Sequence, residues 1–229
     1  MTTYTEFANV AEELEWRGAL FDATPGALHT LATKKVSCYN GFDPTASSLH
    51  IGNLVPIMGL VRLQRHGHSP IALVGGGTGM IGDPSGRVEE RTLMSVAQID
   101  ENVDAIRLQL EPFLDFEVKS NPARIVNNAN WLRDTNLLEF LRDIGKHFTV
   151  NSMMGRESVK GRFDRDSGIS FTEFSYQLLQ AYDFLRLFEQ EKVGFQAGGS
   201  DQWGNILGGV ELIRKIHGAD SDGRPRAHG

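Results

Sequence analysis

Apolar residues recur along this chain with two spacings, one typical of helices and one typical of buried strands. Helical spacing covers residues about 5 to 32, where Thr24-Pro25-Gly26 interrupts it, and predicts an N-terminal helical arm over residues 1–34. Beyond the arm, predicted strands alternate with predicted helices. The strands are expected at 36–39, 70–74, 124–128 and 194–197, and the helices at about 50–67, 93–112, 135–145, 171–190 and 203–217.

Two of the predicted strands run directly into glycine-rich loops. Residues 70–74 are continuously apolar, as in a strand buried on both faces of a parallel sheet, and Gly75-Gly76-Gly77 follows them. The strand at 194–197 leads into Gly198-Gly199 in the same way. Strands that alternate with helices indicate a doubly wound α/β sheet, whose ligands bind at the carboxyl ends of the strands. The amphipathic helix at about 50–67 has one apolar face, formed by Ile51, Leu54, Val55, Met58 and Val61.

Composition and charge narrow the classes of protein that fit. With 229 residues, 40% hydrophobic and 23% charged, the chain has a soluble globular profile and enough length for one large domain. Cys38 is the single cysteine, so no disulfide can form within the chain. No leader-like N-terminus and no run near the ~18 apolar residues of a membrane span is present, which predicts a cytosolic protein without a membrane partner. The net charge of −6 argues against general nucleic-acid binding, so any RNA contact must be local or lie outside the chain.

Polar residues surround the predicted helix start near His50. Backbone N–H groups at a helix N-terminus and the positive end of its dipole suit phosphate. Gly52 would let a flat ligand approach the backbone, and Thr45, His50 and Asn53 add side-chain donors. Taken singly, these residues have plainer explanations. His50 could cap a helix or lie in the core, and Asp43 could belong to a simple turn.

Taken together, the motifs resemble the first signature of class I aminoacyl-tRNA synthetases, in nearly the wording of the bacterial-type tyrosine enzymes. The matching segments follow the order of that family: GFDPTA (41–46), LHIGN (49–53), GGGTGMIGDPSG (75–86), SFTEFSY (170–176), QAYD (180–183) and GGSDQWGN (198–205). Several long matches in one order are far more specific than a lone glycine motif. The resemblance implies a Rossmann-like catalytic domain over 35–229, with a connective insertion at about 125–165.

The resemblance further implies a tyrosine-binding pocket. Its residues would be Tyr39, Asp83, Asn128, Tyr176, Gln180, Asp183 and Gln202. Tyr39 and Asp183 would hydrogen-bond the phenolic hydroxyl, and such a site disfavours phenylalanine because its own polar groups are then left unpaired. Asp83, Tyr176 and Gln180 would surround the α-ammonium group. From local sequence alone, Tyr39 could instead be a strand aromatic and Asp183 a surface charge.

ATP is implied as the second substrate, with Mg²⁺ as counter-ion of the triphosphate and no tightly bound cofactor. Its residues would be Gly41, Asp43, Thr45, His50, Gly52, Asn53, Gly199 and Asp201. Asp201 would accept a ribose hydroxyl, although it could also cap the following helix. Thr45 and His50 would act on the leaving phosphates, helped by Arg87 and Arg91, which could also be ordinary surface charges. No Cys/His metal spacing is present.

The implied reaction joins tyrosine to ATP as tyrosyl-adenylate and then transfers the tyrosyl group to tRNA(Tyr). Two alternatives stay open, a non-catalytic nucleotide- or RNA-binding relative and a tryptophan-specific synthetase. A homodimer is expected through the insertion, where Phe148, Val150, Met153 and Met154 could contribute or belong to the core. The family's second signature, a lysine-rich loop over ATP, would follow residue 229 together with RNA-binding regions. We therefore expect this chain to bind tyrosine but to activate it slowly.

Overall fold

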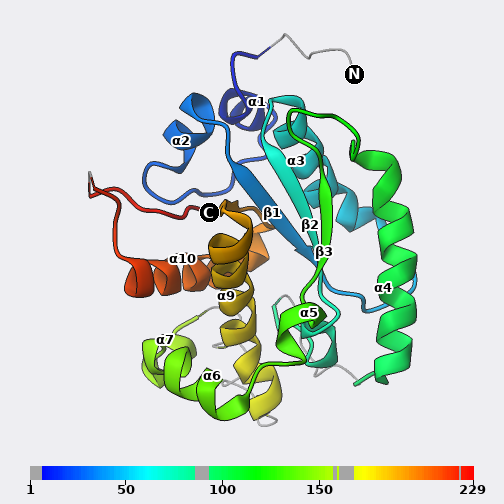
Figure 1. The fold of residues 1–229 in the computed structure, drawn as a ribbon, viewed down its shortest axis with the longest axis vertical. Coiled ribbons are helices and arrows are strands. Elements are labelled where there is room, and N and C mark those ends of the chain that lie inside the picture. Colours follow the sequence, from blue (N-terminus) through cyan, green and yellow to red (C-terminus); the bar gives the residue numbers. More distant parts are fainter. Residues whose placement is uncertain (1–6, 86–92, 157–158, 160–167, 222) are drawn as a thin grey trace.

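A single parallel sheet forms the centre of the molecule. The computed structural model describes residues 7–85, 93–156, 159, 168–221 and 223–229. Within these residues, four strands pair in the order β3-β2-β1-β4 (Figure 1). The strands are β1 (Ser37–Phe42), β2 (Ser69–Val74), β3 (Arg124–Asn127) and β4 (Val193–Gln196). The predicted parallel α/β sheet is confirmed, with small shifts in the strand bounds.

The register of the strands brings their carboxyl ends to one edge. Phe42 at the end of β1 lies opposite Val74 of β2, and Val74 lies opposite Asn127 of β3. Tyr39 of β1 lies opposite Gln196, the last residue of β4. The loops that follow the four strands therefore start close together, which is where ligands bind in open parallel sheets.

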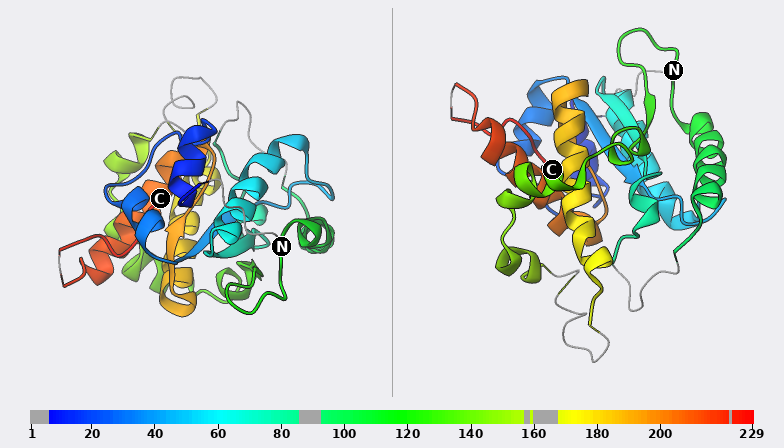
Figure 2. Two further views of the ribbon diagram at one scale, coloured as in Figure 1. Left: turned by 90° about the horizontal axis from the view of Figure 1, so that it is seen from above. Right: turned by 60° about the horizontal axis from the view of Figure 1, so that its bottom comes forward.

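Helices cover both faces of the sheet (Figure 1, Figure 2). The α-helices are α1 (Val10–Trp16), α2 (Ala27–Thr33), α3 (Leu54–Arg65), α4 (Val96–Leu110), α5 (Ala129–Leu132), α6 (Leu137–Asp143), α7 (Val150–Met154), α9 (Phe171–Glu191) and α10 (Trp203–His217). Short 3₁₀ turns are η1 (Ile51–Asn53), η2 (Thr78–Met80), η3 (Glu111–Phe113), η4 (Gly145–His147) and η5 (Ser200–Gln202). The apolar spacing predicts neither α5 nor α7, which span only 4 and 5 residues. No helix among the described residues combines the length and apolar character that crossing a membrane requires.

Neighbouring residues of β1 point to opposite faces and enter different cores. Cys38 and Phe42 pack in a cluster with residues of α3 and α4, whereas Tyr39 packs in a second cluster with residues of α9 and α10. Ser95 and Ser170 cap α4 and α9 by accepting hydrogen bonds from backbone N–H groups in the first helical turns. These two helices, one on each face, supply several of the polar side chains that reach the sheet edge or the loop after β1.

The N-terminal arm is two short helices and not one continuous helix. Turns and irregular backbone at 17–26 separate α1 from α2, and Gly26 precedes α2 with a φ of +83°, which favours glycine. Glu13 of α1 is 3% exposed and fastens the arm to α3. Its carboxylate lies 2.7 Å from Arg17 Nε, 2.9 Å from His66 Nε2 and 3.5 Å from Arg62 Nε.

The apolar face predicted for the helix at about 50–67 is correct at Val61, which is buried, and at Met58, which packs against the core, but it is wrong at the start of the segment. Residues Ile51–Asn53 form the turn η1, and α3 begins only at Leu54. Ile51 and Val55 are 85% and 71% exposed, whereas Ile57 and Leu60 are buried. Apolar residues lie on more than one side of this helix, so the sequence alone does not decide which side is buried. In the structure the sheet covers the side that carries Ile57 and Leu60.

Candidate active site

The first part of the site is a buried pair of polar side chains from β1 and α9. Tyr39 is 0% exposed, and its ring packs on Phe184 with 5.3 Å between the ring centroids. The Tyr39 hydroxyl has no hydrogen-bond partner among the described residues. Burial and then the charge of Asp183 raise the pKa of Tyr39 well above its ordinary value, so the two groups lie close enough to interact and the hydroxyl keeps its proton.

Asp183 is held by two donors from the segment after β3. Its Oδ2 accepts a hydrogen bond from Asn128 Nδ2 at 2.7 Å, and its Oδ1 accepts one from Trp131 Nε1 at 2.8 Å. Burial raises the pKa of Asp183 to about 8, although the hydrogen bonds from Asn128 and Trp131 lower it. Since both oxygens accept from N–H groups, a further hydroxyl donor beside this carboxyl would favour its ionised form.

A second polar group gathers where α9 meets the segment after β4. Gln202 Nε2 donates to Asp83 Oδ2 at 2.7 Å, and Gln180 Nε2 donates to Gln202 Oε1 at 3.2 Å. Tyr176 and Gln180 lie one helical turn apart on α9, as their spacing predicts, but Tyr176 donates to Asp43 Oδ2 at 2.9 Å. Asp43, assigned to ATP from the sequence, thus contacts a residue of the predicted tyrosine set.

Thr78 joins the two polar groups. Its hydroxyl donates to Asp43 Oδ1 at 2.9 Å and accepts from Asn128 Nδ2 at 3.0 Å, and the same Nδ2 reaches Asp183. Gly75 leaves the space for this contact, because a Cβ there would collide with the Asp43 carboxylate and the Thr78 hydroxyl. The structure therefore brings the predicted tyrosine-binding residues Tyr39, Asp83, Asn128, Tyr176, Gln180, Asp183 and Gln202 to one edge of the sheet.

The loop after β1 carries most of the predicted nucleotide residues at the surface. His50 Nδ1 accepts from Gly52 N–H at 3.1 Å, while Asn53 Oδ1 accepts from His50 N–H at 2.9 Å. His50 is therefore the cap of η1, in agreement with the plainer explanation of this residue. Gly41, Thr45, His50 and Gly52 are all exposed, so the loop is open to a ligand.

Two side chains of α4 fasten this loop, and sequence reasoning missed both. Asn102, 2% exposed, donates from Nδ2 to Pro44 O at 3.0 Å. Gln109 accepts from Leu49 N–H at 3.0 Å and donates to Ser47 O at 2.9 Å. The available signal was an asparagine on the apolar face of a helix, where a buried amide requires partners.

Gly199 and Asp201 follow β4 on the exposed side of the edge. Asp201 Oδ2 accepts from Gln202 Nε2 at 3.0 Å and lies within η5, while the cap position of α10 is Gln202. The alternative that Asp201 caps this helix is therefore wrong. Gly199 and Asn40 line a cavity of about 970 Å³ between the arm, the start of α3 and the end of β4. Among its walls are the apolar side chains of Trp16 and Val55.

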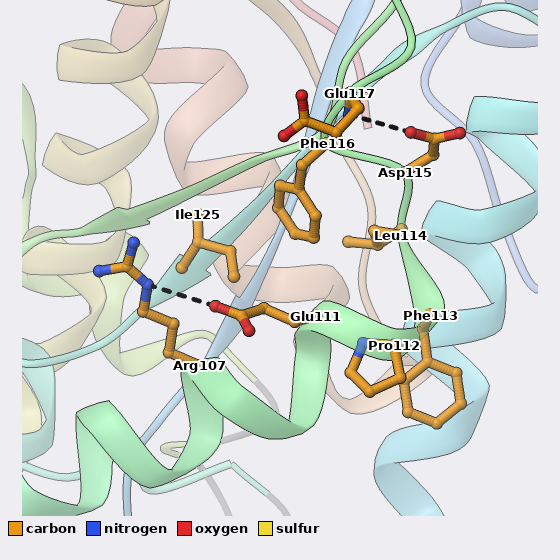
Figure 3. A pocket seen from close by; sticks show the side chains of 9 residues that line it. All are labelled: Arg107, Glu111, Pro112, Phe113, Leu114, Asp115, Phe116, Glu117 and Ile125. Atoms are coloured by element: carbon orange, nitrogen blue, oxygen red, sulfur yellow. Dashed lines mark hydrogen bonds and ion pairs between the residues drawn. The ribbon is translucent and has the colours of Figure 1, made fainter.

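A second cavity, of about 620 Å³, lies at the end of α4 (Figure 3). Phe113, Phe116 and Ile125 line it, with the Arg107–Glu111 ion pair beside them. It contains none of the predicted site residues. Arg87 and Arg91 lie outside the described residues, and within the part of the chain that the structure describes no group of three or more His, Cys, Asp or Glu could hold a metal ion.

An α/β domain whose sheet edge joins an exposed, glycine-containing helix start to a cluster of buried polar side chains is typical of nucleotide-binding enzymes. Residues 31–224 match the family described as tRNA synthetases class I (W and Y), and the chain belongs to this family. It is 58% identical over 215 residues to a tyrosine–tRNA ligase of Anaeromyxobacter dehalogenans, and the aligned region covers 94% of this chain and 50% of that protein. It is 54% identical over 214 residues to that of Roseiflexus castenholzii, with coverages of 93% and 50%. The predicted resemblance to the bacterial-type tyrosine enzymes is confirmed.

Solved structures lead to the same fold. A C-terminally truncated mitochondrial tyrosyl-tRNA synthetase of Aspergillus nidulans matches with a TM-score of 0.81 and 33% identity, over 96% of this chain and 66% of that one. A tyrosyl-tRNA synthetase of Aeropyrum pernix matches with a TM-score of 0.65 over 96% of this chain and 60% of that one, but at 18% identity it supports the fold alone. The chain spans about half the length of the curated relatives it matches.

Proposed function

We propose that this chain is the part of a tyrosine–tRNA ligase that binds tyrosine and ATP and forms tyrosyl-adenylate, for later transfer to tRNA(Tyr). The observation that carries the proposal is the buried Tyr39 hydroxyl, which interacts with the charge of Asp183 and has no hydrogen-bond partner among the described residues, while each Asp183 oxygen accepts one hydrogen bond. A phenolic hydroxyl can both accept from Tyr39 and donate to Asp183. Phenylalanine can do neither and would leave both groups without a ligand partner.

The remaining contacts to tyrosine are those that the resemblance implies, and charge and geometry support them. Asp83 matches the α-ammonium group in charge, and Tyr176 and Gln180 fix its direction from α9. The Gln180 Oε1 atom is buried without a partner among the described residues, which suits an acceptor for an ammonium N–H. Gln202, bound to Asp83, would contact the substrate carboxylate, and Asn128 acts by holding Asp183.

ATP would bind at the exposed side of the same edge. Gly41, Gly52 and Gly199 allow close approach, and Asp201 accepts from a ribose hydroxyl. Thr45, His50 and Asn53 would serve the phosphates from the loop after β1, together with Arg87 and Arg91, and MgATP is the form of the substrate. His50 uses Nδ1 within its own turn, so Nε2 is the atom that it offers to a phosphate oxygen.

Chemistry requires no protein nucleophile. The tyrosine carboxylate attacks the α-phosphorus of ATP, the bond to the bridging oxygen breaks, and pyrophosphate leaves. The protein's contribution is to align the two substrates and to stabilise charge on the departing phosphates. This is why most of the side chains named here position a ligand and none is a strongly activated nucleophile.

A calorimetric titration of the 229-residue chain with tyrosine, tryptophan and phenylalanine tests the proposal. We expect tyrosine to bind tightest, with phenylalanine and tryptophan weaker by at least tenfold. Equal binding of phenylalanine would contradict the role of Tyr39 and Asp183. Preferred binding of tryptophan would favour the alternative specificity, and binding of ATP with none of the amino acids would favour a non-catalytic relative.

A homodimer in the cytosol completes the proposal. Apolar side chains are exposed on α6 and α7, namely Leu137, Leu138, Leu141, Val150 and Met154. Of the residues considered from the sequence, Met153 is buried and Phe148 packs against the core, so they do not belong to this surface. Light scattering should show a dimer that Leu138→Glu converts to a monomer and Leu108→Glu, on α4, does not. A monomeric unsubstituted chain would contradict this arrangement.

A further inference from the structure

Hydrogen bonds between side chains connect the two ends of the proposed tyrosine pocket. The chain of contacts runs from Asp183 to Asn128 at 2.7 Å, to Thr78 at 3.0 Å, to Asp43 at 2.9 Å and to Tyr176 at 2.9 Å. It begins and ends on α9, because Asp183 and Tyr176 both belong to that helix. Between them it passes through the segments after β3, β2 and β1, so three of the four strand ends contribute one member each.

The chemistry of the groups fixes the direction of each bond. Thr78 has one hydroxyl hydrogen, and the Asp43 carboxylate can only accept, so Thr78 donates to Asp43. The Thr78 oxygen must then accept from Asn128 Nδ2. The oxygen of the same amide supports this orientation, because Asn128 Oδ1 accepts a hydrogen bond from Gly77 N–H at 2.7 Å. The amide of Asn128 is therefore held with its NH₂ group toward both Asp183 and Thr78.

The directions of these hydrogen bonds determine which donors and acceptors Tyr176 and Asp183 present to a ligand. Tyr176 donates its hydrogen to Asp43, which leaves the Tyr176 oxygen as an acceptor suited to an ammonium N–H. At the other end, the Asn128 NH₂ group holds one oxygen of Asp183 and keeps that carboxyl available for a hydroxyl donor. Thr78 is 2% exposed and joins the two halves through its single hydroxyl.

We propose that Thr78 is a positioning residue whose hydroxyl couples recognition of the phenolic end of the substrate to recognition of its ammonium end. The inference rests on the proposed function, since it names the residue that sets specificity in that same pocket. Thr78→Val keeps the shape of the side chain but removes the hydroxyl. Asn128 then loses an acceptor and Asp43 loses one of its donors, so the donors and acceptors at both ends are less firmly oriented.

The test compares affinity ratios across ligands. Three ligands are titrated calorimetrically: tyrosine, phenylalanine, which lacks the hydroxyl, and 3-(4-hydroxyphenyl)propionate, which lacks the ammonium group. In Thr78→Val we expect both ratios, tyrosine over phenylalanine and tyrosine over the propionate, to fall about 3- to 10-fold, the range of one hydrogen bond. Thr78→Ser should restore both ratios. Thr33→Val, which removes an exposed threonine hydroxyl from α2, should leave them unchanged.

Each other outcome has a defined meaning. If Thr78→Val weakens all three ligands equally, Thr78 is merely structural and the inference is overturned, as it is when only one ratio falls. If the unsubstituted chain itself fails to prefer tyrosine over phenylalanine, the proposed function fails, and this result is separable because it involves no variant. If Thr78→Val does not fold by circular dichroism, the comparison of Thr78→Ala with Thr78→Ser supplies the same two ratios.

Discussion

Replacing Tyr39 by phenylalanine should stabilise the ligand-free protein and weaken tyrosine binding. The Tyr39 side chain is 0% exposed and its hydroxyl has no partner among the described residues, so the folded state buries a polar group without a hydrogen bond. Such a group costs about 1–3 kcal/mol. Phenylalanine removes that cost and keeps the ring contact with Phe184. We expect the free energy of unfolding to rise by about 1 kcal/mol, the lower end of that range.

Binding should change in the opposite direction. The phenolic hydroxyl of the substrate loses one hydrogen-bond donor, which is worth about 0.5–1.5 kcal/mol, or roughly two- to tenfold in affinity. Tyr176→Phe is the matched control, because it removes the same atom from a buried tyrosine that does have a partner. Its hydroxyl donates to Asp43 at 2.9 Å, so its loss should destabilise the ligand-free protein by about 1–3 kcal/mol.

Urea denaturation of the three proteins, with and without saturating tyrosine, measures all of these quantities. Without ligand, we expect Tyr39→Phe to be more stable and Tyr176→Phe to be less stable than the unsubstituted chain. With tyrosine, the stabilisation that the ligand adds should be smaller in both variants. If Tyr39→Phe proved clearly less stable than the unsubstituted chain without ligand, its hydroxyl would have a partner in the folded protein and the account of the pocket would be refuted.

Three further predictions concern charge and the loop after β1. Burial raises the pKa of Asp183 from 3.8 to about 8, so between these pH values the folded chain retains a proton that the unfolded chain loses. Urea denaturation should therefore show that the contribution of this carboxyl to the free energy of unfolding falls from pH 4 to pH 8, and Asp183→Asn should not show this trend. Glu13 behaves oppositely: burial would raise its pKa, but hydrogen bonds from Arg17 and His66 leave it lowered, so Glu13→Gln should destabilise the protein at pH 7 and matter progressively less below pH 4.5. Gln109→Ala should weaken binding of MgATP severalfold by calorimetry and leave tyrosine affinity within a factor of about two, since it releases the loop at 47–49 and touches no tyrosine-binding residue; an equal loss for both ligands would contradict this.

The local sequence pattern predicted the sheet well because the apolar run of β2 is uninterrupted and because glycines follow both β2 and β4. The run at 70–74 is buried along its length, and the helix expected at 203–217 has those bounds in the structure. Pattern failed where several faces of a segment are apolar, as in α3, and where helices are too short to show a period, as in α5 and α7. Such cases are decided by packing against the sheet and not by local spacing.

The candidate site could be predicted only as far as the motifs reach. Tyr39 and Asp183 were implied by resemblance, and the structure places the two side chains close enough to interact electrostatically. Thr78, inside a quoted motif, had no assigned role because its partners lie 35 and 50 residues away in the chain. Trp131, Asn102 and Gln109 lie in segments without a motif. Their importance depends on which backbone or carboxyl group folding places beside them.

Under the proposed function, specificity for tyrosine requires that Tyr39 and Asp183 do not hydrogen-bond each other. A carboxyl that was free to rotate could accept from the Tyr39 hydroxyl, and the empty pocket would then lose nothing by admitting phenylalanine. Asp183 is not free, because Asn128 and Trp131 hold its two oxygens from the segment after β3, and Thr78 in turn orients Asn128. The Tyr39 hydroxyl has no hydrogen-bond partner among the described residues, and under the proposed function the hydroxyl of tyrosine is the group that supplies one. Under the proposed function, the unpaired Tyr39 hydroxyl both lowers the stability of the ligand-free chain and favours tyrosine over phenylalanine, which is why one substitution should move the two quantities in opposite directions.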